Sequence, residues 1–140
     1  MTVPYICLRI QPHQDGPAYH PVVATLSLGS HTVMHYYDFP ATGSVREPRL
    51  SLILEPRSLV ITAQEQYTEW AHGIDAVSED RVARGDLELA NAGMLGNGGS
   101  STSGTASLLS EGGVLSRQTR YSLTCRDVAR VMNVSIGARK

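Results

Sequence analysis

The strongest limit on how this chain can fold is a succession of short runs rich in β-branched and apolar residues, each ended by glycine, proline or a polar turn. Runs of this kind are typical of β-strands. Strands are therefore predicted over residues 5–10, 22–28, 31–37, 50–54, 58–62 and 119–126. Residues 63–71 predict one short helix, and residues 78–92 are compatible with a second. The pattern favours an all-β sandwich or barrel.

A chain of 140 residues is expected to form a single domain over residues 1–140, since this length can enclose one hydrophobic core. Residues 92–113 differ in composition from the rest, because Gly, Ser and Thr dominate them. Such a segment cannot bury enough apolar surface to offset the entropy lost on ordering it. It is predicted to be a flexible loop inserted in the domain before the last strand.

The overall charge excludes few functions. The 12 Lys and Arg residues against 13 Asp and Glu give a net charge of −1, so the chain has no general basic field that would by itself indicate nucleic-acid binding. Cys7 and Cys125 lie far apart, and residues 1–10 lack the apolar core of a secretory signal, so an intracellular setting is expected. No apolar run approaches the roughly 18 to 20 residues that span a bilayer, so no membrane association is expected.

Four of the five histidines lie between residues 11 and 39, and one of them forms the sequence His13-Gln14-Asp15. Side chains two apart on an extended segment point to the same side, so this imidazole and this carboxylate can converge on one metal ion. Two histidines and one carboxylate are the usual ligands of non-haem Fe(II). From the residues alone, a surface or hydrogen-bonded pair stays open. The candidates for a second histidine ligand are His20, His31, His35 and His72.

Arg120 and Arg126 are six residues apart on the last predicted strand. An even spacing places both guanidinium groups on the same face, and two inward cations require an anion. A guanidinium matches a carboxylate in shape and charge, so the pair is a candidate anchor for a dicarboxylate cosubstrate. The alternative is that the two arginines are solvated or pair with Asp127 or Glu111.

Three stretches in this order give the chain a recognisable likeness: PHQDGPAYHPVVATLSLGSHTVMHYY, RLSLILEPRSLVITAQEQYTEWAHGI and TRYSLTCRDVARV. Together they resemble the AlkB-like Fe(II)/2-oxoglutarate-dependent dioxygenases, most of all the branch of the sixth mammalian AlkB homologue. The resemblance implies a double-stranded β-helix, a relative of the jelly roll and the cupin fold.

The resemblance also implies roles for individual residues. His13 and Asp15 match the first two iron ligands, and His72 in WAHGI matches the third. Arg120 matches the residue that pairs with the distal carboxylate of 2-oxoglutarate, and Arg126 matches one close to the cosubstrate and the metal. The implied activity is oxidative demethylation of nucleic acid or protein, with succinate and formaldehyde as products, in the nucleus or the cytoplasm.

The chain also departs from the family pattern. Only twelve residues precede His13, where family members carry a longer segment with a substrate lid, the first strands and an Asn-x-Tyr that contacts 2-oxoglutarate. The chain is therefore expected to be short at its N-terminus. The alternatives to an enzyme are a catalytically weak or inactive chain that acts as a binding or regulatory module, and a cupin-like metal protein without oxidative chemistry. Tyr67 and Trp70, near His72, are expected to pack beneath the site.

Overall fold

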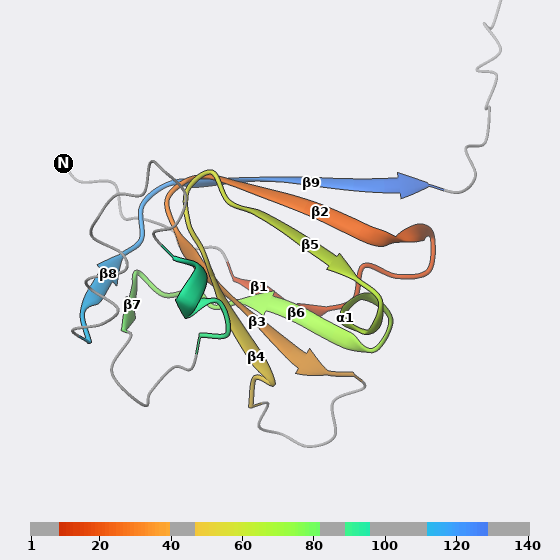
Figure 1. The fold of residues 1–140 in the computed structure, drawn as a ribbon, viewed down its shortest axis with the longest axis horizontal. Coiled ribbons are helices and arrows are strands. Elements are labelled where there is room, and N and C mark those ends of the chain that lie inside the picture. The colour runs from red at the N-terminus through yellow and green to blue at the C-terminus, as the bar shows by residue number, and fades with distance from the viewer. Residues whose placement is uncertain (1–8, 40–46, 82–88, 96–111, 129–140) are drawn as a thin grey trace, which may run out of the picture.

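The computed structural model describes residues 9–39, 47–81, 89–95 and 112–128, and strands are their main secondary structure (Figure 1). The strands are β1 (Ile10–His13), β2 (Tyr19–Gly29), β3 (Thr32–Asp38), β4 (Leu50–Leu54), β5 (Leu59–Ala63), β6 (Trp70–Ile74), β7 (Glu79–Arg81), β8 (Val114–Ser116) and β9 (Arg120–Val128). The helical residues are one turn, α1 (Glu65–Thr68), and a 3-10 turn at Ala92–Met94. The prediction of an all-β fold is confirmed.

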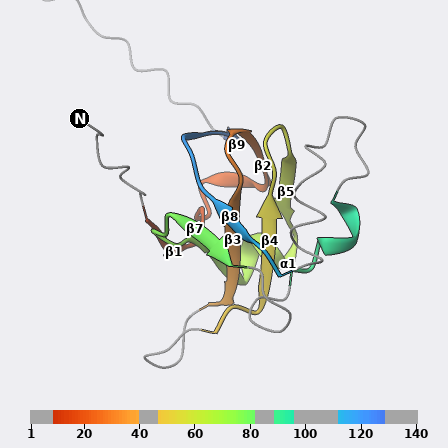
Figure 2. The same cartoon turned by 90° about the vertical axis from the view of Figure 1, so that its left-hand side faces the viewer.

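The strands form two facing antiparallel sheets. One has the order β1-β6-β3-β4 and the other the order β5-β2-β9, while β7 and β8 form a separate pair. Apart from the neighbouring pair β3 and β4, the successive strands from β1 to β6 alternate between the sheets, so that β1, β3, β4 and β6 lie in one layer and β2, β5 and β9 in the other (Figures 1 and 2). This arrangement has the jelly-roll character of a double-stranded β-helix, as predicted.

The central strand β3 of the four-stranded sheet is buried on both of its faces. Met34, Tyr36 and Leu54 face the three-stranded sheet and form one apolar cluster with Ile74. The alternate residues Val33 and Ile53 face the other way, into a second cluster completed by Leu89, Leu95 and Leu115. Because side chains alternate along a strand, burial of both faces makes β3 a nearly continuous buried run.

The outer edge of β4 is covered by the segment that contains Asn91. The Asn91 side-chain amide accepts a hydrogen bond from the Ile53 N–H at 3.1 Å and donates one to the Ile53 carbonyl at 2.8 Å. Leu89 adds a short parallel bridge to Ser51. These contacts satisfy backbone groups that would otherwise form an exposed edge.

By contrast, β9 is an edge strand whose second side has no partner strand among the described residues. The outer face of its sheet is apolar, because Leu59 and Leu123 are both register partners of Leu26. The exposed apolar residues of this outer face are Val22, Leu59, Ile61, Tyr121 and Leu123. We refer to these five residues as the outer patch.

Several secondary-structure predictions are wrong. The helix predicted over residues 63–71 is only the turn Glu65–Thr68, and Trp70–Ile74 is instead strand β6 between β1 and β3. Pairing on both sides of β6 stabilises the extended backbone more than a short helix could. Similarly, residues 79–81 of the compatible helix 78–92 form β7, while residues 82–88 lie outside the described residues.

The first strand also differs from the prediction. Residues 5–8 lie outside the described part of the chain, and β1 continues through Pro12 to His13. Since β1 is at an edge of its sheet, Pro12 removes no hydrogen bond that the sheet requires.

The Gly/Ser-rich segment is partly within the described structure. At its start, residues 92–94 form the 3-10 turn and Leu95 is buried in the cluster around Val33. Residues 96–111 lie outside the described residues, so the predicted loop stays a prediction there. Within the described part of the chain, no helix is long and apolar enough to cross a membrane.

Candidate metal centre

Two histidines from distant parts of the chain meet across a pair of neighbouring strands. His13 ends β1, and its register partner on β6 is His72. Their ring centroids are 4.6 Å apart. Strand pairing therefore brings together two imidazoles that are separated by most of the first half of the sequence.

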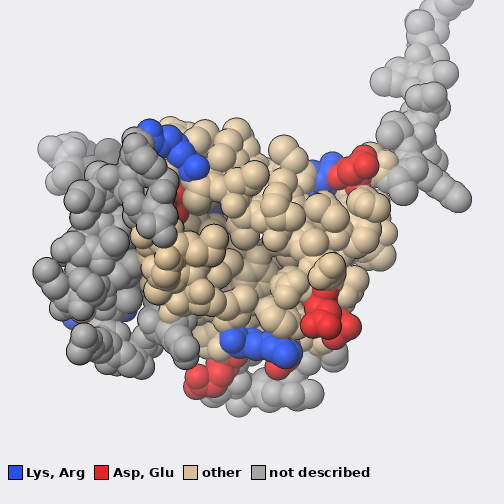
Figure 3. Space-filling model, viewed as in Figure 1, with Lys and Arg blue, Asp and Glu red and all other residues tan. Residues whose placement is uncertain are grey.

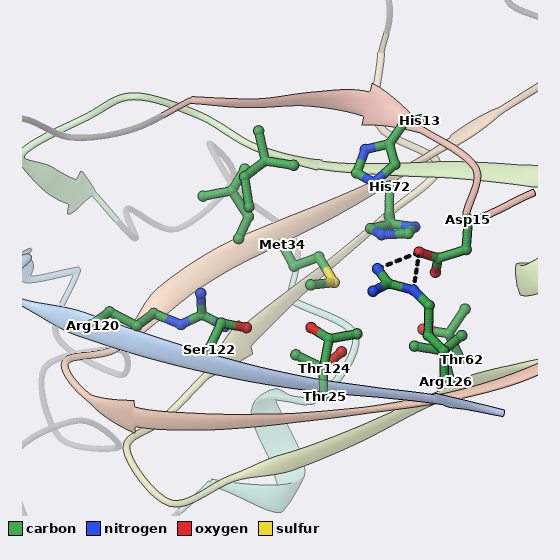
Figure 4. Close-up of a pocket in the computed structure, with 13 residues that line it drawn as sticks. His13, Asp15, Thr25, Met34, Thr62, His72, Arg120, Ser122, Thr124 and Arg126 are labelled. Atoms are coloured by element: carbon green, nitrogen blue, oxygen red, sulfur yellow. Dashed lines mark hydrogen bonds and ion pairs between the residues drawn. The ribbon is translucent and has the colours of Figure 1, made fainter. Parts of the chain in front are cut away.

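Asp15 completes a cluster with these histidines. It lies in the loop that follows β1, not on the extended strand that the sequence spacing suggested. Ligand atoms of His13, Asp15 and His72 all lie within 4.8 Å of one another, and the three side chains converge in Figure 4. Among the described residues, this is the one group of His, Cys, Asp and Glu with a spacing that suits a metal ion. The donors are those that non-haem iron prefers.

The surroundings keep both imidazoles suitable as ligands. His13 Nδ1 donates a hydrogen bond to the Gln11 carbonyl at 2.8 Å, which leaves Nε2 as the nitrogen with a free lone pair. Burial is the main cause that lowers the pKa of His72, and the nearby His13 and Arg126 act in the same direction against Asp15. A neutral imidazole is the form that binds a metal.

Arg126 holds the carboxylate of Asp15. The Arg126 Nε donates to Asp15 Oδ1 at 2.7 Å, and a second guanidinium nitrogen contacts the same oxygen. The Asp15 side chain is only 4% exposed, against 32% for Arg126. Both contacts end on Oδ1, so the ion pair fixes the position of this carboxylate. The alternative that Arg126 pairs with Asp127 is therefore not what the structure shows.

Arg120 lies on the same face of β9 with part of its guanidinium unpaired. One terminal nitrogen donates to Ser27 Oγ at 2.8 Å, with Ser122 Oγ at 3.4 Å. Its Nε is buried and has no hydrogen-bond partner among the described residues. Burial and the charge of Arg117 lower the Arg120 pKa, yet a guanidinium keeps its proton in proteins. An unpaired charged donor of this kind favours an incoming anion.

Both arginines and the cluster line one cavity between the two sheets. Its volume is about 230 Å³, and it opens to solvent. That is several times the roughly 30 Å³ that one water molecule occupies. The lining residues are Ile10, His13, Asp15, Val23, Thr25, Met34, Thr62, His72, Ile74, Arg120, Ser122, Thr124 and Arg126 (Figure 4).

The turn α1 fixes the loop that carries Asp15, a role that the sequence did not reveal. The Tyr67 hydroxyl donates to the Gly16 carbonyl, and Gln14 Nε2 donates to the Thr68 carbonyl at 2.9 Å. Because α1 leads directly into β6, the same turn connects the Asp15 loop to the strand of His72. Tyr67 is buried, as its predicted packing role requires, but its hydroxyl has a specific partner as well.

The other histidine candidates lie elsewhere. His35 is buried on the opposite face of β3, where its Nδ1 is 2.8 Å from Ser51 Oγ. His31 contacts the buried Asp80, which also binds Arg117 through both carboxylate oxygens. His20 is exposed. The structure thus brings His72, and none of these three, to the pair at residues 13 and 15.

Comparison with known proteins finds an informative similarity. No family model matches it. A curated protein of Danio rerio described as "Probable RNA/DNA demethylase ALKBH6" is 33% identical over 135 residues, which make up 91% of this chain and 51% of that protein. The chain thus spans about half the length of this curated relative. Together with the all-β fold, this similarity supports an assignment to the AlkB-like family, near the ALKBH6 branch.

Proposed function

We propose that the chain is an Fe(II)/2-oxoglutarate-dependent dioxygenase domain of AlkB type that demethylates nucleic acid oxidatively. The observation that carries the proposal is the convergence of His13, Asp15 and His72 within 4.8 Å, in the same cavity as an Arg120 with an unpaired donor. A metal site next to an anchor for a small acid is what this chemistry requires.

The residues present fit Fe(II). His13 and His72 would each supply a nitrogen, and Asp15 would supply a carboxylate oxygen. The hydrogen bond from His13 to Gln11 and the ion pair from Arg126 to Asp15 fix the two ligands at residues 13 and 15 before metal binds. Such outer contacts orient metal ligands and raise metal affinity.

The cavity also fits 2-oxoglutarate. The Arg120 guanidinium would bind the distal carboxylate, with its Nε gaining the partner that it lacks. Thr25, Thr62 and Thr124 add hydroxyl groups to the cavity wall. Arg126 stands beside the metal ligands, where its charge attracts the other end of a dicarboxylate.

When bound together, Fe(II), 2-oxoglutarate and dioxygen supply the hydroxylation of a C–H bond, and an N-methyl group hydroxylated in this way leaves as formaldehyde. The protein's residues provide placement. Strand pairing would hold His13 and His72 in place, the ion pair with Arg126 would hold Asp15, and Arg120 would set the orientation of the acid.

The relative's description as an RNA/DNA demethylase supports a nucleic-acid substrate for this chain. An N-methylated base would have to be single-stranded or flipped out of its stack to enter the cavity. On the face shown in Figure 3, the basic side chains of the described residues are isolated and uncharged residues fill the middle, so the described residues form no broad basic patch there. An intracellular location, nuclear or cytoplasmic, stays a prediction.

An anaerobic titration tests the metal and cosubstrate sites. Fe(II) and 2-oxoglutarate are added to the protein without oxygen, and a charge-transfer absorption band of the joint complex is expected. His72→Ala should abolish the band, while the matched variant His20→Ala, at an exposed histidine, should keep it. Absence of the band in the wild type, or its persistence in His72→Ala, would contradict the proposal.

A turnover assay separates the enzyme from the binding module. With oxygen and single-stranded oligonucleotides that carry N-methylated bases, succinate and formaldehyde should form in equal amounts. A protein that shows the band but yields no formaldehyde from methylated RNA, DNA or peptide would be the catalytically weak binding module. Metal binding without any effect of 2-oxoglutarate would indicate the cupin-like alternative.

A further inference from the structure

Met34 places a thioether in the wall of the cavity. It lies on β3, and its side chain is only 6% exposed. It shares the inner face of β3 with Tyr36, whose hydroxyl is 2.8 Å from Thr62 Oγ1 on the facing sheet. Figure 4 shows the Met34 side chain directed between the ligand cluster and β9.

Strand register places Met34 next to the ligand cluster. Tyr36 is the register partner of His72, and His35 is the partner of Gly73. Met34, two residues from Tyr36, is therefore diagonal to His72 on the same face. Diagonal neighbours in an antiparallel pair are roughly 7–8 Å apart, within reach of a long side chain. The flexible methionine side chain can span such a gap.

Among the side chains that line the cavity, Met34 is the most easily oxidised. The other lining residues are aliphatic, hydroxyl-bearing, imidazole, carboxylate or guanidinium groups. A thioether is converted to a sulfoxide by transfer of a single oxygen atom. The described free cysteine, Cys125, is exposed and does not line the cavity.

We propose that Met34 is a self-oxidation site, converted to methionine sulfoxide when the protein turns over without a nucleic-acid substrate. The inference rests on the proposed dioxygenase function. Dioxygen and 2-oxoglutarate are the co-reactants. One oxygen atom forms the S–O bond with a lone pair of Sδ, and the other enters succinate as 2-oxoglutarate loses carbon dioxide. Methionine and 2-oxoglutarate each give two electrons, and dioxygen accepts four.

Oxidation of Met34 should inactivate the proposed catalytic site. Met34 packs in the apolar cluster with Tyr36, Leu54 and Ile74, and an added oxygen makes this side chain polar and bulkier in the cavity wall. A sulfoxide disrupts an apolar cluster of this kind. The expected consequence is progressive loss of succinate formation during turnover without substrate, accompanied by oxidation of Met34.

The test incubates the 140-residue protein with Fe(II), 2-oxoglutarate and air, with catalase to remove peroxide. Peptide mass spectrometry then measures the gain of one oxygen atom at each methionine, and succinate is measured in the same samples. Met94 is the matched internal control, because it is 75% exposed whereas Met34 is 6% exposed. A diffusing oxidant should modify Met94 first, whereas oxidation at the site should modify Met34 first.

Two controls distinguish oxidation by the bound iron from oxidation by a diffusing species. Zn(II) in place of Fe(II) occupies the site without redox chemistry, so Met34 should stay unmodified in a folded protein. Met34→Leu conserves volume and should prolong succinate formation, whereas Met94→Leu should leave its time course unchanged.

The outcomes separate this inference from the proposed function. Succinate formation with Met34 unmodified, or with Met94 modified first, overturns the inference and leaves the dioxygenase intact. No succinate under any condition overturns both. Preferential oxidation of Met34 that requires both Fe(II) and 2-oxoglutarate supports the proposal.

Discussion

At the scale of single residues, Arg120 is the side chain whose replacement tests the anion site best, because its buried Nε has no hydrogen-bond partner among the described residues. Arg120→Gln should weaken 2-oxoglutarate binding by roughly tenfold or more, since a hydrogen bond to a charged group contributes about 1.5–3 kcal/mol. Calorimetric titration of the metal-loaded protein measures the change. Arg49→Gln is the control, because Arg49 forms an exposed pair with Asp38 away from the cavity. Equal affinities in wild type and Arg120→Gln would contradict the assignment.

His35 gives a pH dependence to folding. Burial lowers the pKa of His35 below its ordinary 6.5, since the attraction of Asp75 and Asp80 only partly offsets burial and the charge of Arg117. As the pH falls below 6.5, the unfolded chain takes up a proton at His35 more readily than the folded chain does. The free energy of unfolding therefore falls as the pH falls. Urea unfolding of the metal-free protein should show this loss between about pH 7 and about pH 5.

The His35→Gln variant should flatten part of this pH dependence, whereas His20→Gln, at an exposed histidine, should leave it unchanged. Some dependence should survive in His35→Gln, because burial lowers the pKa of His72 as well and acts with the same sign. If the free energy of unfolding of His35→Gln changed with pH as steeply as that of the wild type, the His35 imidazole would not contribute to the pH dependence.

At the scale of elements, α1 fixes the position of the loop that carries Asp15. Tyr67→Phe removes the hydroxyl that donates to Gly16, while keeping the ring in place. We expect metal affinity to fall about tenfold, as for other outer contacts of ligands, while the free energy of unfolding changes by only about 1 kcal/mol. Competition with a chelator measures the first quantity and urea unfolding the second. Tyr121→Phe, on the exposed outer patch, should change neither quantity. Unaltered metal affinity in Tyr67→Phe would show that the contact with Gly16 does not position Asp15 for the metal.

At the scale of the whole molecule, the outer patch lies on the sheet that ends in β9, and the second side of β9 has no partner strand among the described residues. Exposed apolar area next to an unpaired edge favours association between copies. The isolated chain should therefore self-associate as its concentration rises. Leu123→Lys should reduce this association in sedimentation experiments, and Met94→Lys, at an exposed site on a different part of the fold, should not. A chain that stays monomeric at high concentration would show that the patch is too small to drive association.

Features that depend on local periodicity could be predicted from the amino-acid sequence without the structure. Alternating apolar residues defined most strands, and the even spacing of Arg120 and Arg126 predicted that both face one side, as both line the cavity. The two-residue spacing of His13 and Asp15 likewise suggested convergence, although the loop, not the strand, achieves it. The inferences about strands and about the arginine pair succeed because the backbone of a strand sets the directions of its neighbouring side chains.

Which distant residues meet is a property of the folded chain. From the residues alone, several histidines could have completed the cluster, and it is the pairing of β1 with β6 that places His72 there. The same is true of the Arg126–Asp15 ion pair and of the Tyr67 contact with Gly16, and the first two residues of β6 fell in the predicted helix 63–71. Such contacts depend on strand register and sheet order, which long-range burial and hydrogen bonding fix and which no local pattern encodes.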